Sequence, residues 1–187
     1  YEPSDGPIPG VVQVGVVIAE ELRTRFGIPV VHSTKIHDYP VWSRAYWNSR
    51  ITAQELVNAH KELRLVLDIH RDEGTTISAT TGENVSRVLL VVTSAEENAD
   101  LPHPRWRENL AFAQVLHRKF EELYPGLSKG IQIRKDNRFN QHVHPRALLL
   151  EVGGSEDTLE QALSTARLCA HVIAEVIYDE LAATGGY

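Results

Sequence analysis

The chain has 187 residues, of which 42% are hydrophobic, and its formal net charge at pH 7 is −6. This length fits one globular domain with its own core, so we expect residues 1–187 to form a single domain. The acidic balance without a basic tract excludes a typical nucleic-acid-binding protein, and the single Cys169 excludes an internal disulfide. No run reaches the roughly 18 apolar residues of a membrane span, so we expect this piece to be soluble.

The first half of the chain predicts two helices and two strands. After a loop rich in Pro and Gly, apolar residues at helical spacing predict a helix from Val11 to a stop at Gly27. We expect a strand over residues 28–32, a helix over 43–60 and a strand over 63–70. The last strand is apolar on both faces, which is typical of a strand covered by helices above and below.

The second half predicts three strands and two helices. The helix after Pro104 carries apolar residues three to four positions apart and ends at YPGL. The last helix begins near Asp157 and Glu160, which have the spacing of a capping box. The strands are expected over residues 85–93, 131–135 and 146–152.

Strands that alternate with helices in this way predict an α/β sandwich with a largely parallel sheet. Ligands of such sheets bind at the carboxyl ends of the strands. Two strands carry polar residues at that end, in LVLDIHRD at 65–72 and LLLEVGG at 148–154. We therefore look for functional residues there.

Asp68, His70 and Asp72 share one face of their strand, whereas Ile69 and Arg71 face the other way. An aspartate two residues from a histidine can orient the imidazole or bind a metal ion beside it. The alternative is a histidine that ends the strand and makes local hydrogen bonds.

Glu151 follows three leucines, so its carboxylate must be paired, compensated by a metal ion, or raised in pKa. A raised pKa suits a general acid or base, and Gly153 and Gly154 allow a substrate to approach closely. The alternative is a salt bridge to Arg71 or Arg146.

A catalytic zinc site uses three protein ligands and leaves one position for water. His70 offers one ligand, and His142 and His144 offer the HxH spacing of two more. Arg138, Asn140 and Gln141 precede the strand of Glu151 and are candidates for substrate contacts; the alternative is loop-shaping hydrogen bonds. The remaining histidines are interpreted as surface or hydrogen-bonded residues, namely His32, His37, His60, His103, His117 and His171.

Several segments together resemble the stage II sporulation protein P family of endospore-forming bacteria. In chain order they are GIPVVHSTKIHDYP, AYWNSRIT, VLDIHRD, HPRWRENLAFA, YPGLSKGI, RFNQHVHPRALLLEVG and DTLEQAL. The resemblance implies a zinc-dependent N-acetylmuramoyl-L-alanine amidase that cleaves peptidoglycan, with endopeptidase action also associated with the family. It implies a three-layer fold similar to the cell-separation zinc amidases, with a mixed, mainly parallel sheet between helices.

The resemblance also implies roles for two residues. His70 matches a zinc ligand of the family and Glu151 matches its catalytic glutamate, with Asp68 and Asp72 as candidates to orient His70. Two further zinc ligands and the first strand of the family would precede Tyr1, and because the chain contains no Met we expect a segment upstream. Without these ligands, this chain alone would be inactive. Neighbouring family positions need not be histidine, which weakens the prediction for His142 and His144.

The family resemblance further implies a membrane anchor upstream, action outside the cytoplasmic membrane during engulfment of the forespore, and stage II sporulation proteins D and M as partners. Two other classes of function stay open. One is a cell-wall-binding scaffold without catalysis, and the other is a different zinc peptidase that uses His70, His142 and His144.

Overall fold

The computed structural model describes residues 10–77, 84–183 and 185. Its helices are α1 (Gly10–Thr24), α2 (Ala45–Ala59), α3 (Trp106–Leu123) and α4 (Leu159–Ala183), and its strands are β1 (Val66–Asp72), β2 (Val88–Thr93), β3 (Ser128–Arg134) and β4 (Ala147–Gly154). Short 3-10 turns, η1 (Trp42–Arg44) and η2 (Gln141–Val143), precede α2 and β4. None of the described helices combines the length and the apolar character needed to cross a bilayer.

The four described strands form one sheet in the order β1-β4-β2-β3. The β1–β4 and β2–β3 pairs are parallel, whereas β2 and β4 are antiparallel. The predicted mixed, mainly parallel sheet is therefore confirmed.

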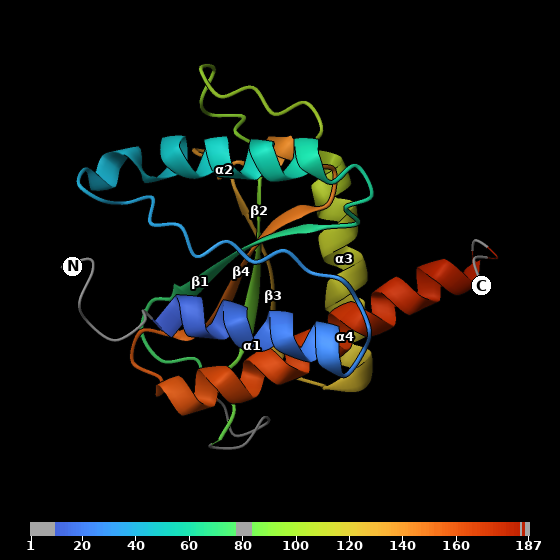
Figure 1. Cartoon of the computed structure of the whole chain (residues 1–187). Helices are drawn as coiled ribbons and strands as arrows, with labels where there is room; N and C mark the ends of the chain where they lie inside the picture. The colour runs from blue at the N-terminus through green and yellow to red at the C-terminus, as the bar shows by residue number, and fades with distance from the viewer. Residues whose placement is uncertain (1–9, 78–83, 184, 186–187) are drawn as a thin grey trace.

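The sheet lies between helices, which confirms the layered α/β fold. Leu148, Leu150 and Val152 of β4 alternate along one face and join a buried core with residues of α1, α3 and α4. Tyr46 of α2 stacks on His70, which points to the other face. Figure 1 shows the strands between α2 on one side and the adjacent pair of α1 and α4 on the other.

The central strand and the edge strand differ in burial. Nearly every residue of β4 is buried, as the continuous apolar run predicts, because β1 and β2 flank it. Every residue of β1 is only partly buried, so this strand is less covered than its apolar run predicted. The reason is its place at the edge, where no other described strand pairs with it.

The predicted strand over residues 28–32 is also wrong. This segment follows α1 as extended chain without strand pairing. The backbone N–H of Ile28 donates to the Leu22 carbonyl, and the Arg23 guanidinium donates to the Val30 carbonyl. Ile28 and Val30 still pack against the core, so apolar character alone was a misleading signal for a strand here.

The start of α4 differs by one residue from the predicted capping box. Thr158 and Gln161 form it: the Gln161 N–H donates to Thr158 Oγ1 at 3.2 Å, and the Thr158 N–H donates to Gln161 Oε1 at 2.7 Å. Asp157, predicted for this role, turns towards the loop after β1 instead.

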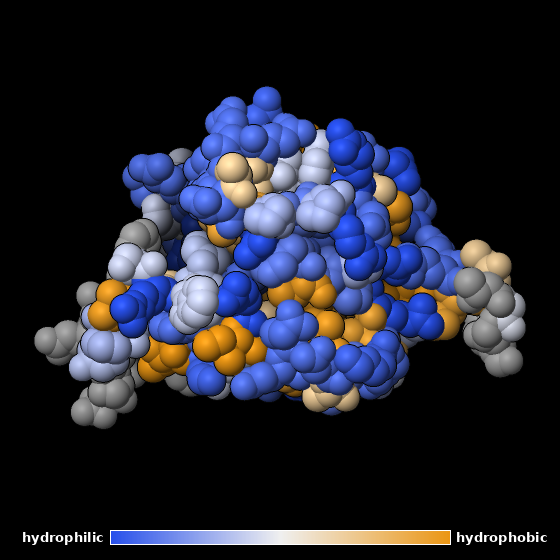
Figure 2. Space-filling model, turned by 90° about the horizontal axis from the view of Figure 1, so that it is seen from above, coloured by the Kyte–Doolittle hydropathy of each residue, from blue (hydrophilic) through white to orange (hydrophobic). Residues whose placement is uncertain are grey.

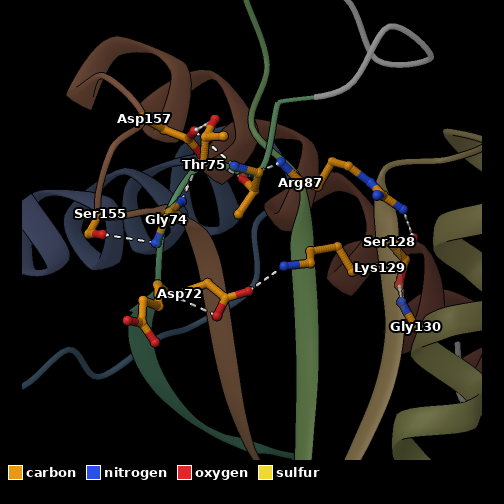
Figure 3. A network of polar contacts seen from close by, with 12 residues as sticks. Asp72, Gly74, Thr75, Arg87, Ser128, Lys129, Gly130, Ser155 and Asp157 are labelled. Carbon is orange, nitrogen blue, oxygen red and sulfur yellow. Dashed lines mark hydrogen bonds and ion pairs between the residues drawn. The ribbon is translucent and has the colours of Figure 1, made fainter.

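Asp157 is the centre of a hydrogen-bond network that closes one end of the sheet (Figure 3). Its carboxylate accepts hydrogen bonds from the Thr75 hydroxyl at 2.8 Å, from both the N–H and the hydroxyl of Thr76, and from the Gly154 N–H at 2.7 Å. Thr76 Oγ1 accepts in turn from the N–H of Arg87, whose guanidinium donates to the Ser128 carbonyl. The network thus links the ends of β1 and β4 to the start of β3.

A close backbone approach fixes the same junction. A Cβ on Gly154 would lie 2.0 Å from the carbonyl oxygen of Gly74, so only glycine fits at position 154. Arg71 adds a bridge, because its guanidinium donates to the carbonyls of Gly154 and Asp157. The loop that follows β1 is therefore held firmly against the end of β4.

We predict that Asp157→Asn lowers the free energy of unfolding at pH 7 by about 2–4 kcal/mol, because a buried carboxylate with several donors is removed. Burial by itself would raise the Asp157 pKa, but the hydrogen bonds from Thr76, Gly154 and Thr75 outweigh it and hold the pKa below its usual range. The stabilisation is then complete above the unfolded-state pKa of about 3.9 and is lost as the pH falls below that value.

Urea denaturation from pH 7 down to pH 3 measures this difference, which shrinks as the pH falls. Asp100→Asn is the matched control, since Asp100 is exposed and lies outside the network, and it should change stability by less than about 0.5 kcal/mol. Equal effects of the two substitutions at pH 7 would contradict the role of Asp157.

Candidate active site

His70 and Glu151 lie next to each other on the paired strands β1 and β4. They are Cα partners in a parallel register, so both side chains project from the same face of the sheet. This face is opposite to the one that Leu148 and Leu150 present to the core. The structure thus brings together the two residues that the sequence singled out at the ends of separate strands.

Asp68 accompanies His70 on that face. His70 Nε2 lies 3.2 Å from Asp68 Oδ1, and the two side chains are 40% and 42% exposed, respectively. Burial lowers the pKa of His70, but the hydrogen bond and charge of Asp68, together with the charge of Glu151, outweigh it and raise the pKa. Asp68 is therefore in contact with the imidazole of His70, and its role in orienting the ring stays a prediction.

Glu151 has neither of the arginine partners weighed in the sequence analysis. Arg146 pairs with Glu180 at 2.6 Å, and Arg71 donates to backbone carbonyls. Glu151 Oε2 is buried without a hydrogen-bond partner among the described residues. Burial raises the pKa of this carboxyl; the charge of His70 opposes the rise, but the charges of Asp72 and Asp68 add to it, and the net direction is upward. An unpaired carboxyl of this kind suits proton transfer.

The side chain of Asp72 does not contact His70 in the way that Asp68 does. The strand register shifts between His70 and Asp72, so the simple alternation along β1 is interrupted before it reaches Asp72. The Asp72 carboxylate instead accepts from the Lys129 ammonium, which reaches across from β3 (Figure 3). Asp72 thus places a lysine beside the site, and its carboxylate contacts that lysine rather than the imidazole.

Tyr46, at the start of α2, covers His70. The two rings are parallel within 2° with centroids 6.4 Å apart, and Phe139 stacks on the Tyr46 ring at 4.9 Å. Burial and the charges of Asp68 and Glu151 raise the pKa of the Tyr46 phenol, which therefore stays protonated. Sequence reasoning assigned Tyr46 no role, because contacts between distant segments leave no local pattern.

The segment Arg138–Gln141 joins α2 to the sheet through its side chains. Asn140 Nδ2 donates to the Tyr46 carbonyl at 2.8 Å and to Ser49 Oγ at 3.0 Å. Gln141 is 2% exposed and uses its amide on the backbone of β2, and Arg138 donates to the Pro102 carbonyl. These contacts are the loop-shaping hydrogen bonds of the alternative interpretation; a role of these residues in substrate binding stays a prediction.

His142 and His144 do not join His70. His144 Nε2 lies 3.1 Å from the Leu63 carbonyl and its Nδ1 accepts from the Arg146 N–H, whereas His142 faces a groove beside α2. Among the described residues, no group of three or more His, Cys, Asp or Glu side chains could hold a metal ion. The histidine trio of the alternative zinc peptidase is therefore not formed.

Comparisons with known proteins identify the family of this chain. A family model described as Stage II sporulation protein P matches residues 2–174. The Stage II sporulation protein P of Bacillus subtilis (strain 168) is 34% identical over 145 residues, which cover 74% of this chain and 34% of that protein. The chain thus spans about a third of the length of this relative.

A solved structure shares the fold. The protein is from Neisseria meningitidis and is assigned as an N-acetylmuramoyl-L-alanine amidase; the TM-score is 0.53 at 16% sequence identity, over 97% of this chain and 87% of that one. The expected likeness to the amidase fold is thereby confirmed.

We predict that Asn140→Ala lowers the free energy of unfolding by about 2–3 kcal/mol and loosens the Tyr46–His70 stack. Asn140 has a φ of 57°, so alanine adds left-handed strain of about 1 kcal/mol to the loss of the two amide hydrogen bonds. Asn140→Gly removes the hydrogen bonds without the strain and should cost about 1 kcal/mol less than Asn140→Ala. Urea denaturation gives both free energies, and the His70 ring resonances in NMR report the stack.

The matched control is Asn137→Ala, because the Asn137 amide donates to the exposed side chain of Asp136 and, among the described residues, has no hydrogen bond to α2. Its effect should stay within about 0.5 kcal/mol. If Asn140→Ala leaves both stability and the His70 resonances unchanged, Asn140 does not fix α2 over the site.

Proposed function

Because the chain belongs to the stage II sporulation protein P family, we propose that it hydrolyses peptidoglycan at the amide between the lactyl group of N-acetylmuramic acid and the L-alanine of the stem peptide. The observation that carries the proposal is the pairing of His70 and Glu151 on one face of the sheet, with Glu151 Oε2 buried and unpartnered among the described residues. An amide is a stable bond, and its hydrolysis requires a base for the attacking water and an acid for the leaving amine.

In this proposal Glu151 serves both needs. It takes a proton from the attacking water and passes it to the nitrogen of the departing L-alanine, so the C–N bond breaks as an amine leaves. The raised pKa of Glu151 suits both halves of this transfer. Asp68 holds the imidazole of His70 in place, and Lys129 contributes positive charge near the reacting carbonyl.

Zinc belongs to the proposal as the group that His70 would help to hold. A bound zinc ion lowers the pKa of a water molecule and polarises a carbonyl. The described residues alone do not complete a zinc site, so further ligands would come from outside them, and in this proposal from the upstream segment that the family resemblance implies. The outer edge of β1 has no described partner, and a strand added there would bring its side chains beside His70.

The biological setting is likewise proposed from the family. The protein would act outside the cytoplasmic membrane during engulfment of the forespore, held by a membrane anchor in a longer chain, together with stage II sporulation proteins D and M. Endopeptidase action on the cross-links would accompany the amidase action.

We predict that Glu151→Gln lowers the rate of peptide release from purified peptidoglycan at least about 100-fold, because the glutamine amide cannot carry the proton. The fold should be kept. The measurement uses a chain extended upstream by its native segment and detects newly exposed L-alanine amino groups. Glu156→Gln is the matched control, because Glu156 is exposed in the turn just after β4 and should release peptide at the normal rate.

A second prediction concerns the metal. A chelator should stop release by the extended chain, and added zinc should restore it. The 187-residue chain should bind zinc only weakly, because its described residues offer one imidazole at the site. Release that a chelator leaves untouched would rule out zinc. Binding to peptidoglycan without release by the extended chain would favour the scaffold interpretation.

A further inference from the structure

One face of α2 carries a row of polar side chains that begins at the candidate site. Tyr46, Arg50, Gln54 and Asn58 are each four residues apart, so they form a slanting row that turns by about 40° around the helix at each step. Tyr46, at one end of this row, covers His70. From Tyr46 to Asn58 the row extends for about 18 Å at the helical rise of 1.5 Å per residue.

A groove runs beside this row, which we call the α2 groove. It has a volume of about 370 Å³ and lies between α2 and η2. Its lining residues are Arg50, Ile51, Gln54, Glu55 and Asn58 of α2, and His142 of η2. Figure 2 views the molecule from the side that α2 occupies in Figure 1, where a mostly hydrophilic surface is broken by separate hydrophobic areas.

The lining of the α2 groove combines hydrogen-bond donors and acceptors with little net charge. Gln54 and Asn58 carry amides that both donate and accept, while Arg50 donates and Glu55 accepts. Such a set matches a ligand with many hydroxyl and acetamido groups better than an anion or a cation. Ile51 adds an apolar wall.

His142 strengthens the case for a ligand. Its Nδ1 is buried without a partner among the described residues, although buried polar atoms are normally hydrogen-bonded. Burial, with the nearby charges of Arg138, His103 and Arg50, lowers the pKa of His142 to about 4. The ring is therefore neutral at pH 7 and can accept a hydrogen bond from a hydroxyl group.

Trp47 lies next to the row at its end nearest the site. Its indole is 60% exposed, and the Arg50 guanidinium lies over the ring at 4.1 Å from the centroid. An exposed aromatic ring offers an apolar face on which the C–H face of a sugar ring can pack. The arginine contact limits the motion of the indole, so less entropy is lost on binding.

From these observations we propose that the α2 groove and Trp47 bind sugar rings of the peptidoglycan glycan strand beyond the ring that carries the cleaved amide. The inference rests on the proposed function for its direction, because the glycan must then pass from the Glu151 site along α2. Binding itself needs no hydrolysis, so the two proposals can fail separately.

The test measures binding of soluble β-1,4 N-acetylglucosamine oligomers and of glycan strands freed of stem peptides, by calorimetry and by NMR shift mapping on the 187-residue chain. Both probes should shift resonances of the groove residues. Gln54→Ala combined with Asn58→Ala should weaken binding roughly tenfold, and Trp47→Ala by a similar factor. The matched control is Gln114→Ala, an exposed glutamine on α3, which should bind normally.

Unchanged affinity in the groove variants overturns the inference, provided that their denaturation curves match that of Gln114→Ala. The inference is also overturned if the peptide-free strands bind and the neutral oligomers do not, because the groove would then recognise the lactyl carboxylates. Shifts caused by free stem peptide in place of glycan also overturn it.

The extended chain separates this inference from the proposed function. There, the double variant should raise KM for polymeric peptidoglycan with kcat unchanged. Glycan binding without hydrolysis would contradict only the proposed function. Hydrolysis with an unaltered KM in the double variant would contradict only the proposal that the α2 groove binds glycan.

Discussion

The parallel pairing of β1 with β4 is the constraint on which the candidate site depends. It sets His70 opposite Glu151, and a slip of one residue would turn one of the two side chains to the helical core on the other face. The close approach of Gly154 to Gly74 and the Asp157 carboxylate secure that register at the carboxyl end of the strands. Much of the polar chemistry near this edge thus serves to fix two strands.

The same arrangement explains why Glu151 can remain unpaired. Candidate cations nearby are already engaged: Arg71 with backbone carbonyls, Arg146 with Glu180, and Lys129 with Asp72. A buried carboxyl without an arginine or lysine partner costs stability, which is typical of functional sites, and the charge of the neighbouring His70 offsets part of this cost. The structure compensates elsewhere, in a core that α1, α3 and α4 build against the opposite face.

Local sequence patterns predicted much of the fold. The apolar run of β4 was sufficient to predict a strand, and the helical spacing in α3 and α4 was sufficient to predict these helices. Burial on both faces of a strand, or along one stripe of a helix, leaves a clear pattern of apolar residues. The prediction of a strand over residues 28–32 was wrong, because Ile28 and Val30 pack on the core although the segment does not pair with a strand of the sheet. The capping residue of α4 lies one position later than predicted, because Asp157 accepts hydrogen bonds from the loop after β1, 81 residues away. Contacts of that range have no signature in the sequence.

The candidate site was predictable in part for the same reason. His70 and Glu151 stood out as polar residues at the ends of apolar strands, and the edge position of β1 could not be foreseen from its composition. Tyr46 and the groove along α2 depend on how a helix from one part of the chain meets a loop nearly 100 residues later, with Asn140 bonded to Tyr46 at a separation of 94 residues.

The connection through Asn140 and Gln141 has a mechanical consequence. Asn140 is bonded to the first turn of α2, while the neighbouring Gln141 is buried against the backbone of β2. A displacement of α2 away from the sheet must therefore break either the amide contacts on the helix or those on the strand. Tyr46, Trp47 and five of the six residues that line the groove lie on α2, so a motion of α2 that uncovers His70 would move them together relative to His142.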